Sequence, residues 1–259
     1  MNKLKAIKNS VTYLLCFILT PMICALLLYL LNVLLHYLGI PPILVSTYFV
    51  ESVVVVVMIG VFALITRKNG FICSAQINKI KIKPAIFFIG IGLSVFFIAM
   101  IILNLVPFLS GEDSDGSSVR TVVGIEIPLI FIAKCILAPI AEEVAYRGLI
   151  YSQLKSAFPK IASIIIVSLV FGVFHLSYSV FMLIETFVMS VFFCYLTDKY
   201  NSIVPSILIH ISNNIVTTLI QCDFVDDKYA IPMFITAMIV FAVSITGICF
   251  DIRKMKTDK

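Results

Sequence analysis

The sequence predicts an all-α fold, a polytopic bundle of about eight transmembrane helices. Of its 259 residues, 61% are hydrophobic and only 13% are charged, and the mean hydropathy is +1.12. Soluble proteins carry about 25% charged residues and roughly 45–50% apolar ones. The composition therefore excludes soluble, collagen-like, disordered and disulfide-rich secreted proteins. The apolar stretches are also too long and unbroken to be barrel strands of about ten alternating residues.

Eight apolar stretches, separated by short polar breaks, are the predicted spans. In chain order they cover residues 11–35, 43–66, 85–107, 121–149, 161–176, 180–197, 202–220 and 230–250. A spanning helix needs about 20 predominantly apolar residues. The fifth and sixth stretches are the least distinct as separate spans. No internal repeat or soluble segment divides the chain, so residues 1–259 are expected to form one integral-membrane domain.

Two segments beside these spans need their own interpretation. The first span follows three lysines, as a signal peptide would, but it is longer than an h-region of about 7–15 residues and has no small-residue cleavage site. It is therefore expected to be a span. Between the second and third spans, three lysines alternate with two isoleucines within residues 70–84. This pattern predicts a segment that lies along the inner interface of the membrane.

Basic residues predict the orientation, because Lys and Arg concentrate in cytoplasmic loops. With the N-terminus inside, sixteen of the 19 Lys and Arg residues fall in inner segments, and only Arg120 and Lys228 fall outside. Lys134 lies within a span. The outer segments instead hold Glu112, Asp113, Asp115, Glu126, Asp223, Asp226 and Asp227. An even number of spans returns the chain to the same side, so both termini are expected to be cytoplasmic in a multi-pass protein of the cell membrane.

The net charge of +5 has the same origin. The cations are spread over several inner loops and do not form a single basic patch, so they favour attraction to anionic lipid of the inner leaflet. The lipid bilayer is therefore an expected partner, and nucleic acid is not.

Ionisable and polar side chains inside the spans are the functional candidates, because each costs about 2.5–3.5 kcal/mol to insert. The candidates are Glu51, Lys134, Glu142, Glu143, Arg147, His175, Glu185, His210, Asn213 and Asn214. Outside the motifs discussed next, Lys134 could pair with Glu51 or Glu185 as a structural bridge or line a substrate path.

The densest group is Glu142, Glu143 and Arg147 in the fourth span. On a helix Glu143 and Arg147 are four residues apart and can form an ion pair on one face. Glu142 is rotated by about 100° from Glu143, so it is left available as a general base. The alternative interpretation is that all three residues only mark the end of the helix at the inner interface.

Two further groups carry histidines. Phe171 and His175 lie four residues apart in the fifth span, and His210 and Asn214 lie four residues apart in the seventh. The second pair projects two donors from one helix face, which could stabilise an oxyanion. Each group also has a structural interpretation, since a lone intramembrane histidine or a polar pair commonly hydrogen-bonds to neighbouring helices.

Together the three groups resemble the motifs of the CAAX prenyl protease and bacteriocin-processing family, the type II CAAX endopeptidases. The family's Glu-Glu-x-x-x-Arg corresponds to Glu142, Glu143 and Arg147, its Phe-x-x-x-His to Phe171 and His175, and its His-x-x-x-Asn to His210 and Asn214. The order and the placement on membrane helices agree. The motif region covers about residues 120–220.

The resemblance implies an intramembrane endopeptidase that cleaves a membrane-embedded or lipidated peptide or protein. In this picture Glu142 and His175 activate a water, His210 and Asn214 stabilise the oxyanion, and Glu143, Arg147 and Phe171 support them. A metallo mechanism is the alternative, in which Glu142, His175 and His210 would hold a divalent metal such as zinc. The His-Glu-x-x-His zinc spacing is absent from the sequence, which favours the metal-independent mechanism.

The catalytic hypothesis requires Glu142, His175, His210 and Asn214 to converge on one cavity. Counted from the inner ends of their spans, His175 lies about 21 Å deep and His210 about 12 Å deep, which strains that expectation. Two other functions use the same residues: a non-catalytic bacteriocin-immunity or peptide-binding membrane protein, and a small transporter with a proton relay. No duplicated, Gly/Pro-broken pair of spans is visible, which disfavours the transporter. The sequence leaves the physiological substrate and the oligomeric state open.

Overall fold

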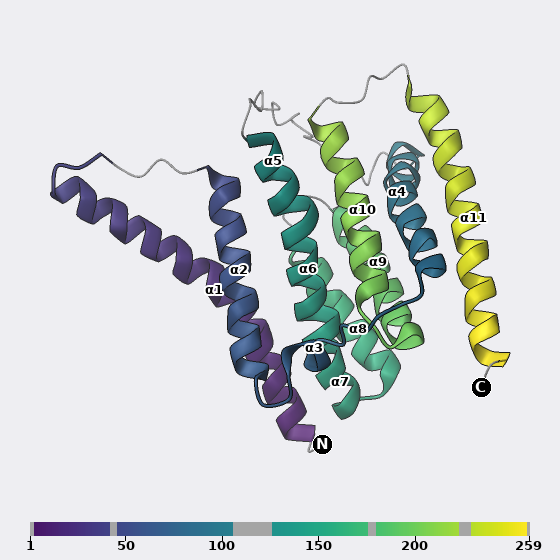
Figure 1. Cartoon of the computed structure of the whole chain (residues 1–259), viewed down its shortest axis with the longest axis horizontal. Helices are drawn as coiled ribbons and strands as arrows, with labels where there is room; N and C mark the ends of the chain where they lie inside the picture. Colours follow the sequence, from purple (N-terminus) through teal and green to yellow (C-terminus); the bar gives the residue numbers. More distant parts are fainter. Residues whose placement is uncertain (1–2, 42–45, 106–125, 176–179, 223–228, 258–259) are drawn as a thin grey trace.

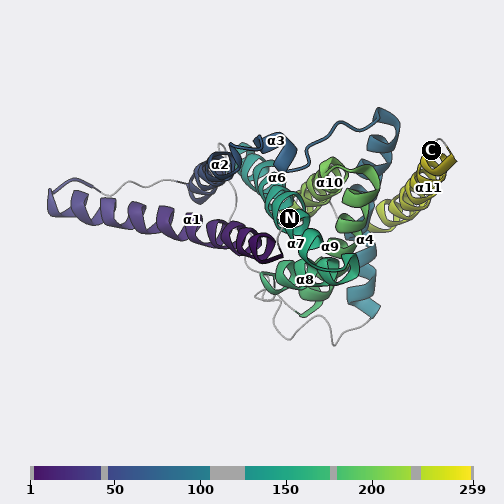
Figure 2. The same ribbon diagram turned by 90° about the horizontal axis from the view of Figure 1, so that it is seen from below.

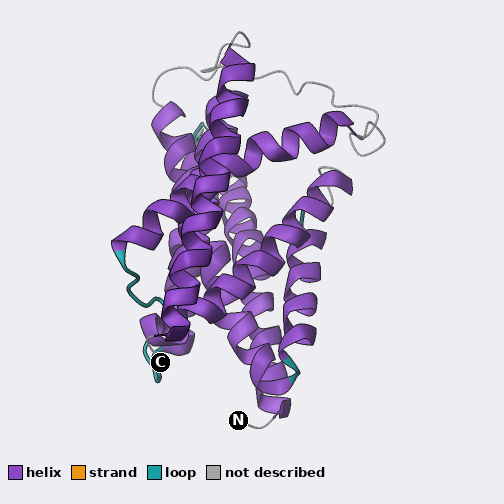
Figure 3. Ribbon diagram, turned by 90° about the vertical axis from the view of Figure 1, so that its right-hand side faces the viewer, coloured by secondary structure: helices purple, strands orange, loops and turns teal. Residues whose placement is uncertain are grey.

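The protein is described by a computed structural model that covers residues 3–41, 46–105, 126–175, 180–222 and 229–257. Within these ranges all regular secondary structure is helical, and no strand is present (Figure 3). The all-α prediction is confirmed for the described residues.

Each predicted span coincides with helical structure. The regular helices are α1 (Lys3–Tyr37), α2 (Thr47–Thr66), α3 (Phe71–Ser74), α4 (Ile82–Leu105), α8 (Lys160–Val173), α9 (Val180–Tyr200), α10 (Val204–Gln221) and α11 (Ala230–Thr257). The fourth span is part of a longer series, here named the central helix, that alternates between α and π geometry. Its segments are α5 (Glu126–Ile130), η2 (Phe131–Leu137), α6 (Ala138–Glu143), η3 (Val144–Tyr151) and α7 (Ser152–Ala157).

Among the described residues, five helices are long and apolar enough to cross a membrane: α1, α2, α4, α9 and α11. Helices α8 and α10 are apolar but shorter, and the central helix is divided into short segments. A multi-pass membrane protein is therefore supported, whereas the total of eight spans stays a prediction.

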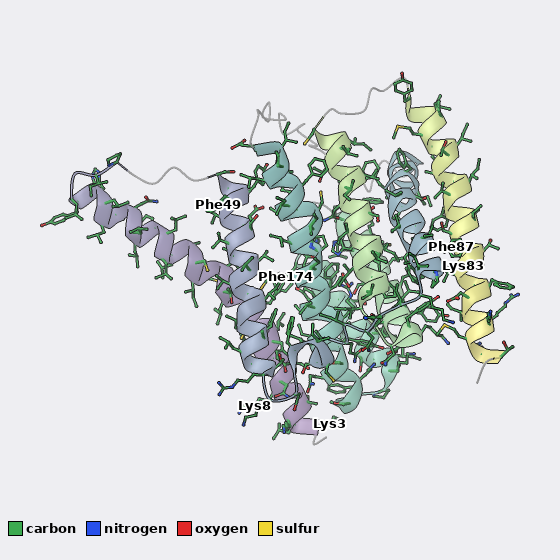
Figure 4. All side chains as sticks on the ribbon, in the orientation of Figure 1. Lys3, Lys8, Phe49, Lys83, Phe87 and Phe174 are labelled. Carbon is green, nitrogen blue, oxygen red and sulfur yellow. The ribbon has the colours of Figure 1, made fainter. Side chains whose placement is uncertain are left out.

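Both termini lie at the same end of the bundle, together with α3 and α7 (Figures 1 and 3). Lys3 and Lys8 lie at this terminal end (Figure 4). This placement agrees with an even number of crossings, while the cytoplasmic location of that end stays a prediction. Most of the acidic residues assigned to outer segments lie outside the described residues: Glu112, Asp113, Asp115, Asp223, Asp226 and Asp227. Arg120 and Lys228 also lie outside them.

The terminal end is held together by polar contacts between helices. Asp198 of α9 accepts a hydrogen bond from Tyr151 at 2.7 Å and pairs with Lys155 and Lys160 at 2.8 Å each. The loop after α3 docks at the same end, where Ser202 donates to the carbonyl of Asn78 at 2.6 Å. Residues 70–84, expected at the inner interface, therefore lie beside the ends of the central helix and α10.

Close helix contacts use glycine. A Cβ at Gly172 of α8 would lie 3.1 Å from the carbonyl oxygen of Leu183 in α9, so the absence of a side chain there lets the two helices pack closely. A Cβ at Gly92 of α4 would overlap the carbonyl oxygen of Ile209, the residue before His210. Helix α1 differs, because its C-terminal half extends away from the other helices (Figure 2). The residues of the three motifs lie on the central helix, α8 and α10, which pack together with α9.

Candidate functional site

A buried ion pair lies at the centre of the site. Arg147 Nη1 lies 2.9 Å from Glu143 Oε1, and both side chains are 0% exposed. The guanidinium carbon lies 4.3 Å from the ring centroid of Phe171 and 5.0 Å from that of Phe193. Aromatic faces attract a cation electrostatically, so the two rings stabilise the arginine where water does not reach it. The ion pair expected from the four-residue spacing is present.

His210 connects the two glutamates. Its Nδ1 lies 3.0 Å from Glu143 Oε1, and its Nε2 lies 3.9 Å from Glu142 Oε2. Glu143 therefore binds both Arg147 and one nitrogen of the imidazole ring. That contact fixes the ring so that the second nitrogen faces Glu142. The Glu142 side chain is 24% exposed, in contrast to its fully buried neighbour.

The Phe171 side chain packs α8 against the central helix and α10. Its ring centroid lies 5.0 Å from that of Tyr146, 4.7 Å from that of His175 and 6.4 Å from that of His210. The phenylalanine thus contacts the arginine of the first motif and the histidines of the other two. This explains physically why a large flat side chain occupies this position.

The packing also bears on the depth of His175, which counting along its span placed about 21 Å from the inner end. Helix α8 runs antiparallel to the central helix, and Phe171 packs on Tyr146. Glu142 lies four residues before Tyr146, and His175 lies four residues after Phe171, so each is displaced by about 6 Å in the same direction. The two side chains are therefore at similar depth. Phe174 lies between the two ends of the bundle, well below the end of α2 marked by Phe49 (Figure 4).

Not all four predicted catalytic residues contact one another directly. His210 lies beside Glu142, whereas His175 is bonded within its own helix. His175 Nδ1 lies 2.8 Å from the carbonyl oxygen of Phe171, its own helix partner. Among the described contacts, His175 is connected to Glu142 through Phe171 and His210. The convergence of the four side chains on one cavity stays a prediction.

Asn214 donates a hydrogen bond to a carbonyl group of the central helix that has no backbone donor. In the π segment η2 the amide of Ala138 donates to the carbonyl of Ala133, five residues back. By the same five-residue spacing, the carbonyl of Lys134 would accept a hydrogen bond from the amide of residue 139. That residue is proline, which has no N–H. Asn214 Nδ2 donates to this carbonyl at 2.9 Å. The carbonyl that Pro139 leaves without a backbone donor is therefore bound by a side chain of α10.

This arrangement predicts coupled effects of Asn214 and Pro139 on stability. Asn214→Ala should destabilise the protein by about 1–3 kcal/mol, because the Lys134 carbonyl then has no donor. In the Pro139→Ala background the loss should be smaller, because residue 139 regains an amide. Thermal unfolding of the four proteins in a double-mutant cycle measures the difference. Strictly additive effects would contradict the coupling.

A cavity of about 320 Å³ lies between α1, α2 and the central helix. Its ionisable lining residues are Glu142 and Glu51. The remaining lining is Phe17, Pro21, Ala25, Thr47, Val50, Val54, Val55, Met58, Ala133, Ala138 and Ala141. Neither histidine lines this cavity, so Glu142 lies between the cavity on one side and His210 on the other.

Several residues of the site were not predicted from the sequence. Phe193 stacks on Arg147 and lies 6.0 Å from His210 between ring centroids, but it belongs to an ordinary apolar run of α9. Tyr146 is also buried against Phe171. Its place between Glu143 and Arg147 in the chain was the available signal. The roles of Pro139 and the Lys134 carbonyl depend on π geometry, which no residue pattern indicated.

Two histidines of the site each direct one ring nitrogen at an oxygen acceptor of the protein. His210 directs Nδ1 at Glu143, and His175 directs Nδ1 at a carbonyl of its own helix. Histidines that bind zinc commonly hold their second nitrogen in this way, which leaves Nε2 for the metal. Within the described part of the chain, no group of three or more His, Cys, Asp or Glu side chains is arranged closely enough to hold a metal ion. A zinc site formed by Glu142, His175 and His210 therefore stays a prediction.

Residues 124–216 match the family described as type II CAAX prenyl endopeptidase Rce1-like. The matched segment contains all three motifs, so the resemblance inferred from them is confirmed over this region. Comparisons with curated proteins and with solved structures found no match. The five long apolar helices of the described residues indicate a multi-pass membrane protein, and its residues 124–216 are similar to CAAX-type endopeptidases.

Proposed function

We propose that the protein is an intramembrane endopeptidase that hydrolyses a peptide bond in a membrane-associated or lipidated peptide. The observation that carries the proposal is the position of His210, which Glu143 holds at 3.0 Å while its other nitrogen faces Glu142 at 3.9 Å. Glu142 in turn lines a cavity of about 320 Å³. A carboxylate, an oriented imidazole and space for an apolar ligand thus adjoin one another. The catalytic region of about residues 120–220 would act within one domain of residues 1–259.

The proposed chemistry begins with water activation. Glu142, with His175, takes a proton from a water whose oxygen attacks the scissile carbonyl carbon. The C–O bond forms as the carbonyl π electrons move to oxygen. When the C–N bond breaks, the proton held by Glu142 passes to the leaving amine. Glu142 thus ends the cycle as a carboxylate and needs no oxidant or second substrate.

The oxyanion would be stabilised by His210 and Asn214. Glu143 occupies Nδ1 of His210, so a donor at Nε2 requires the ring to carry both protons. Asn214 has two amide hydrogens, and the one bound to the Lys134 carbonyl leaves the other for the oxyanion. Donors of this kind are commonly worth several kcal/mol in the transition state.

A His175→Ala variant tests the proposal. Peptide hydrolysis should fall by about 10²-fold or more, because water activation loses the partner of Glu142. The assay uses purified protein in liposomes with a farnesylated peptide and with an unmodified apolar peptide, and mass spectrometry identifies the products. Full cleavage by the variant at wild-type membrane abundance would contradict the proposed role of His175.

A chelator provides the control for mechanism. Wild-type protein treated with an excess of EDTA should retain its activity, because the proposed steps use only side chains and water. Loss of activity that zinc restores would support the metallo alternative. If wild-type protein cleaves neither peptide class but still binds them, the peptide-binding function is favoured over the peptidase.

A further inference from the structure

The cavity beside Glu142 contains a second carboxylate that the proposed reaction does not use. Glu51 of α2 lines it, is exposed, and lies outside the three motifs. The wall is otherwise mainly apolar, with side chains such as Val54, Val55 and Met58. A carboxylate at such a position is expensive in a membrane and therefore indicates a function or a partner.

Glu51 has no ion-pair partner within 4.0 Å among the described residues. The cation of the neighbouring helix is Lys134, and its ammonium lies over the ring of Tyr48, 5.4 Å from the centroid. Lys134 is itself exposed and does not line the cavity. Lys134 therefore acts on Glu51 electrostatically without forming an ion pair with it, and the carboxylate can still pair with a cation that arrives in the cavity.

The distance between Glu51 and the proposed base Glu142 along the helix axes follows from how α2 and the central helix are aligned. The contact of Lys134 with Tyr48 places these two residues at one level. Helix α2 and the central helix run in the same direction, with Glu51 three residues beyond Tyr48 and Glu142 eight beyond Lys134. At 1.5 Å per residue, Glu142 lies about 8 Å deeper along the axis than Glu51. An extended peptide covers that distance in two or three residues, at about 3.3 Å each.

We infer that Glu51 is a specificity residue that binds a cationic side chain of the substrate. An apolar part of the substrate fills the cavity, and a lysine or arginine two or three residues from the scissile bond pairs with Glu51. The inference rests on the proposed function for the position of the scissile bond. The occupant is a peptide carrying one positive charge, because an uncharged ligand would leave the carboxylate unpaired in an apolar wall.

A lysine scan tests the inference. Apolar peptides with one lysine moved through successive positions are compared with the same peptides carrying norleucine, which keeps the chain length without the charge. Wild-type protein in liposomes of neutral lipid should cleave about five- to tenfold faster when lysine lies two or three residues from the cut. Glu51→Gln should reduce this ratio to about one. Glu51→Lys should reverse it in favour of a glutamate peptide.

Two controls keep this test separate from the test of catalysis. Glu185→Gln removes a carboxylate of α9 that does not line the cavity, and it should keep the lysine preference. Fluorescence anisotropy of labelled peptides on the Glu142→Gln protein measures binding without cleavage, so it remains informative if the peptidase proposal fails. Equal binding of lysine and norleucine peptides would overturn the inference and indicate an uncharged occupant. Lysine preference retained by Glu51→Gln would also overturn it.

Discussion

Replacing Glu142 by glutamine is expected to lower peptide hydrolysis by about 10²–10⁴-fold while the protein stays folded. Glutamine has nearly the same shape but cannot accept the proton from water. The Glu142 side chain is partly exposed and its Oε2 lies 3.9 Å from His210, beyond hydrogen-bond distance. The substitution therefore removes the proposed base without breaking a buried contact.

The neighbouring residue supplies the matched control. Glu143→Gln changes the same group one position further along, but it removes the charge that pairs with Arg147 at 2.9 Å. We expect Glu142→Gln to lose activity with an unchanged melting temperature, and Glu143→Gln to lose stability as well. Activity is measured by peptide cleavage in liposomes and stability by thermal unfolding in detergent. A Glu142→Gln protein with wild-type activity would exclude Glu142 as the base.

Much of this arrangement could be predicted because it depends on local spacing. Hydropathy located the helices, since a membrane segment must be apolar over about 20 residues whatever its neighbours are. The pair of Glu143 and Arg147 follows from four-residue spacing on one helix. The same reasoning set Glu142 apart from Glu143, and the structure gives the two glutamates different surroundings: one is fully buried and the other faces a cavity.

The contacts between helices could not be predicted in this way. The link from Asn214 to the Lys134 carbonyl joins residues 80 positions apart and exists because a π segment precedes Pro139. Phe193 belongs to an apolar run of α9, and its contact with Arg147 depends on which helix packs beside it. Spacing within one helix carries no information on that packing. Depth estimates were misleading for the same reason, because they ignored the register that Phe171 sets between α8 and the central helix.

Replacing Arg147 by methionine is expected to destabilise the protein by about 3–5 kcal/mol. Methionine fills much of the space between Phe171 and Phe193, so the packing loss is limited. The main cost is electrostatic, because the fully buried Glu143 then keeps its charge without the guanidinium 2.9 Å away. Thermal unfolding in detergent should give a melting temperature clearly below that of wild type.

The double variant Glu143→Gln with Arg147→Met separates charge from packing. It should recover at least half of the lost stability, because no uncompensated buried charge remains. Its peptidase activity should nevertheless stay low, because the carboxylate that faces Nδ1 of His210 at 3.0 Å is gone and the imidazole is no longer held in its orientation toward Glu142. If the double variant were as unstable as the sum of the single variants, the pair would be two independent packing residues. Stability regained without activity is the result that assigns Glu143 and Arg147 to positioning His210.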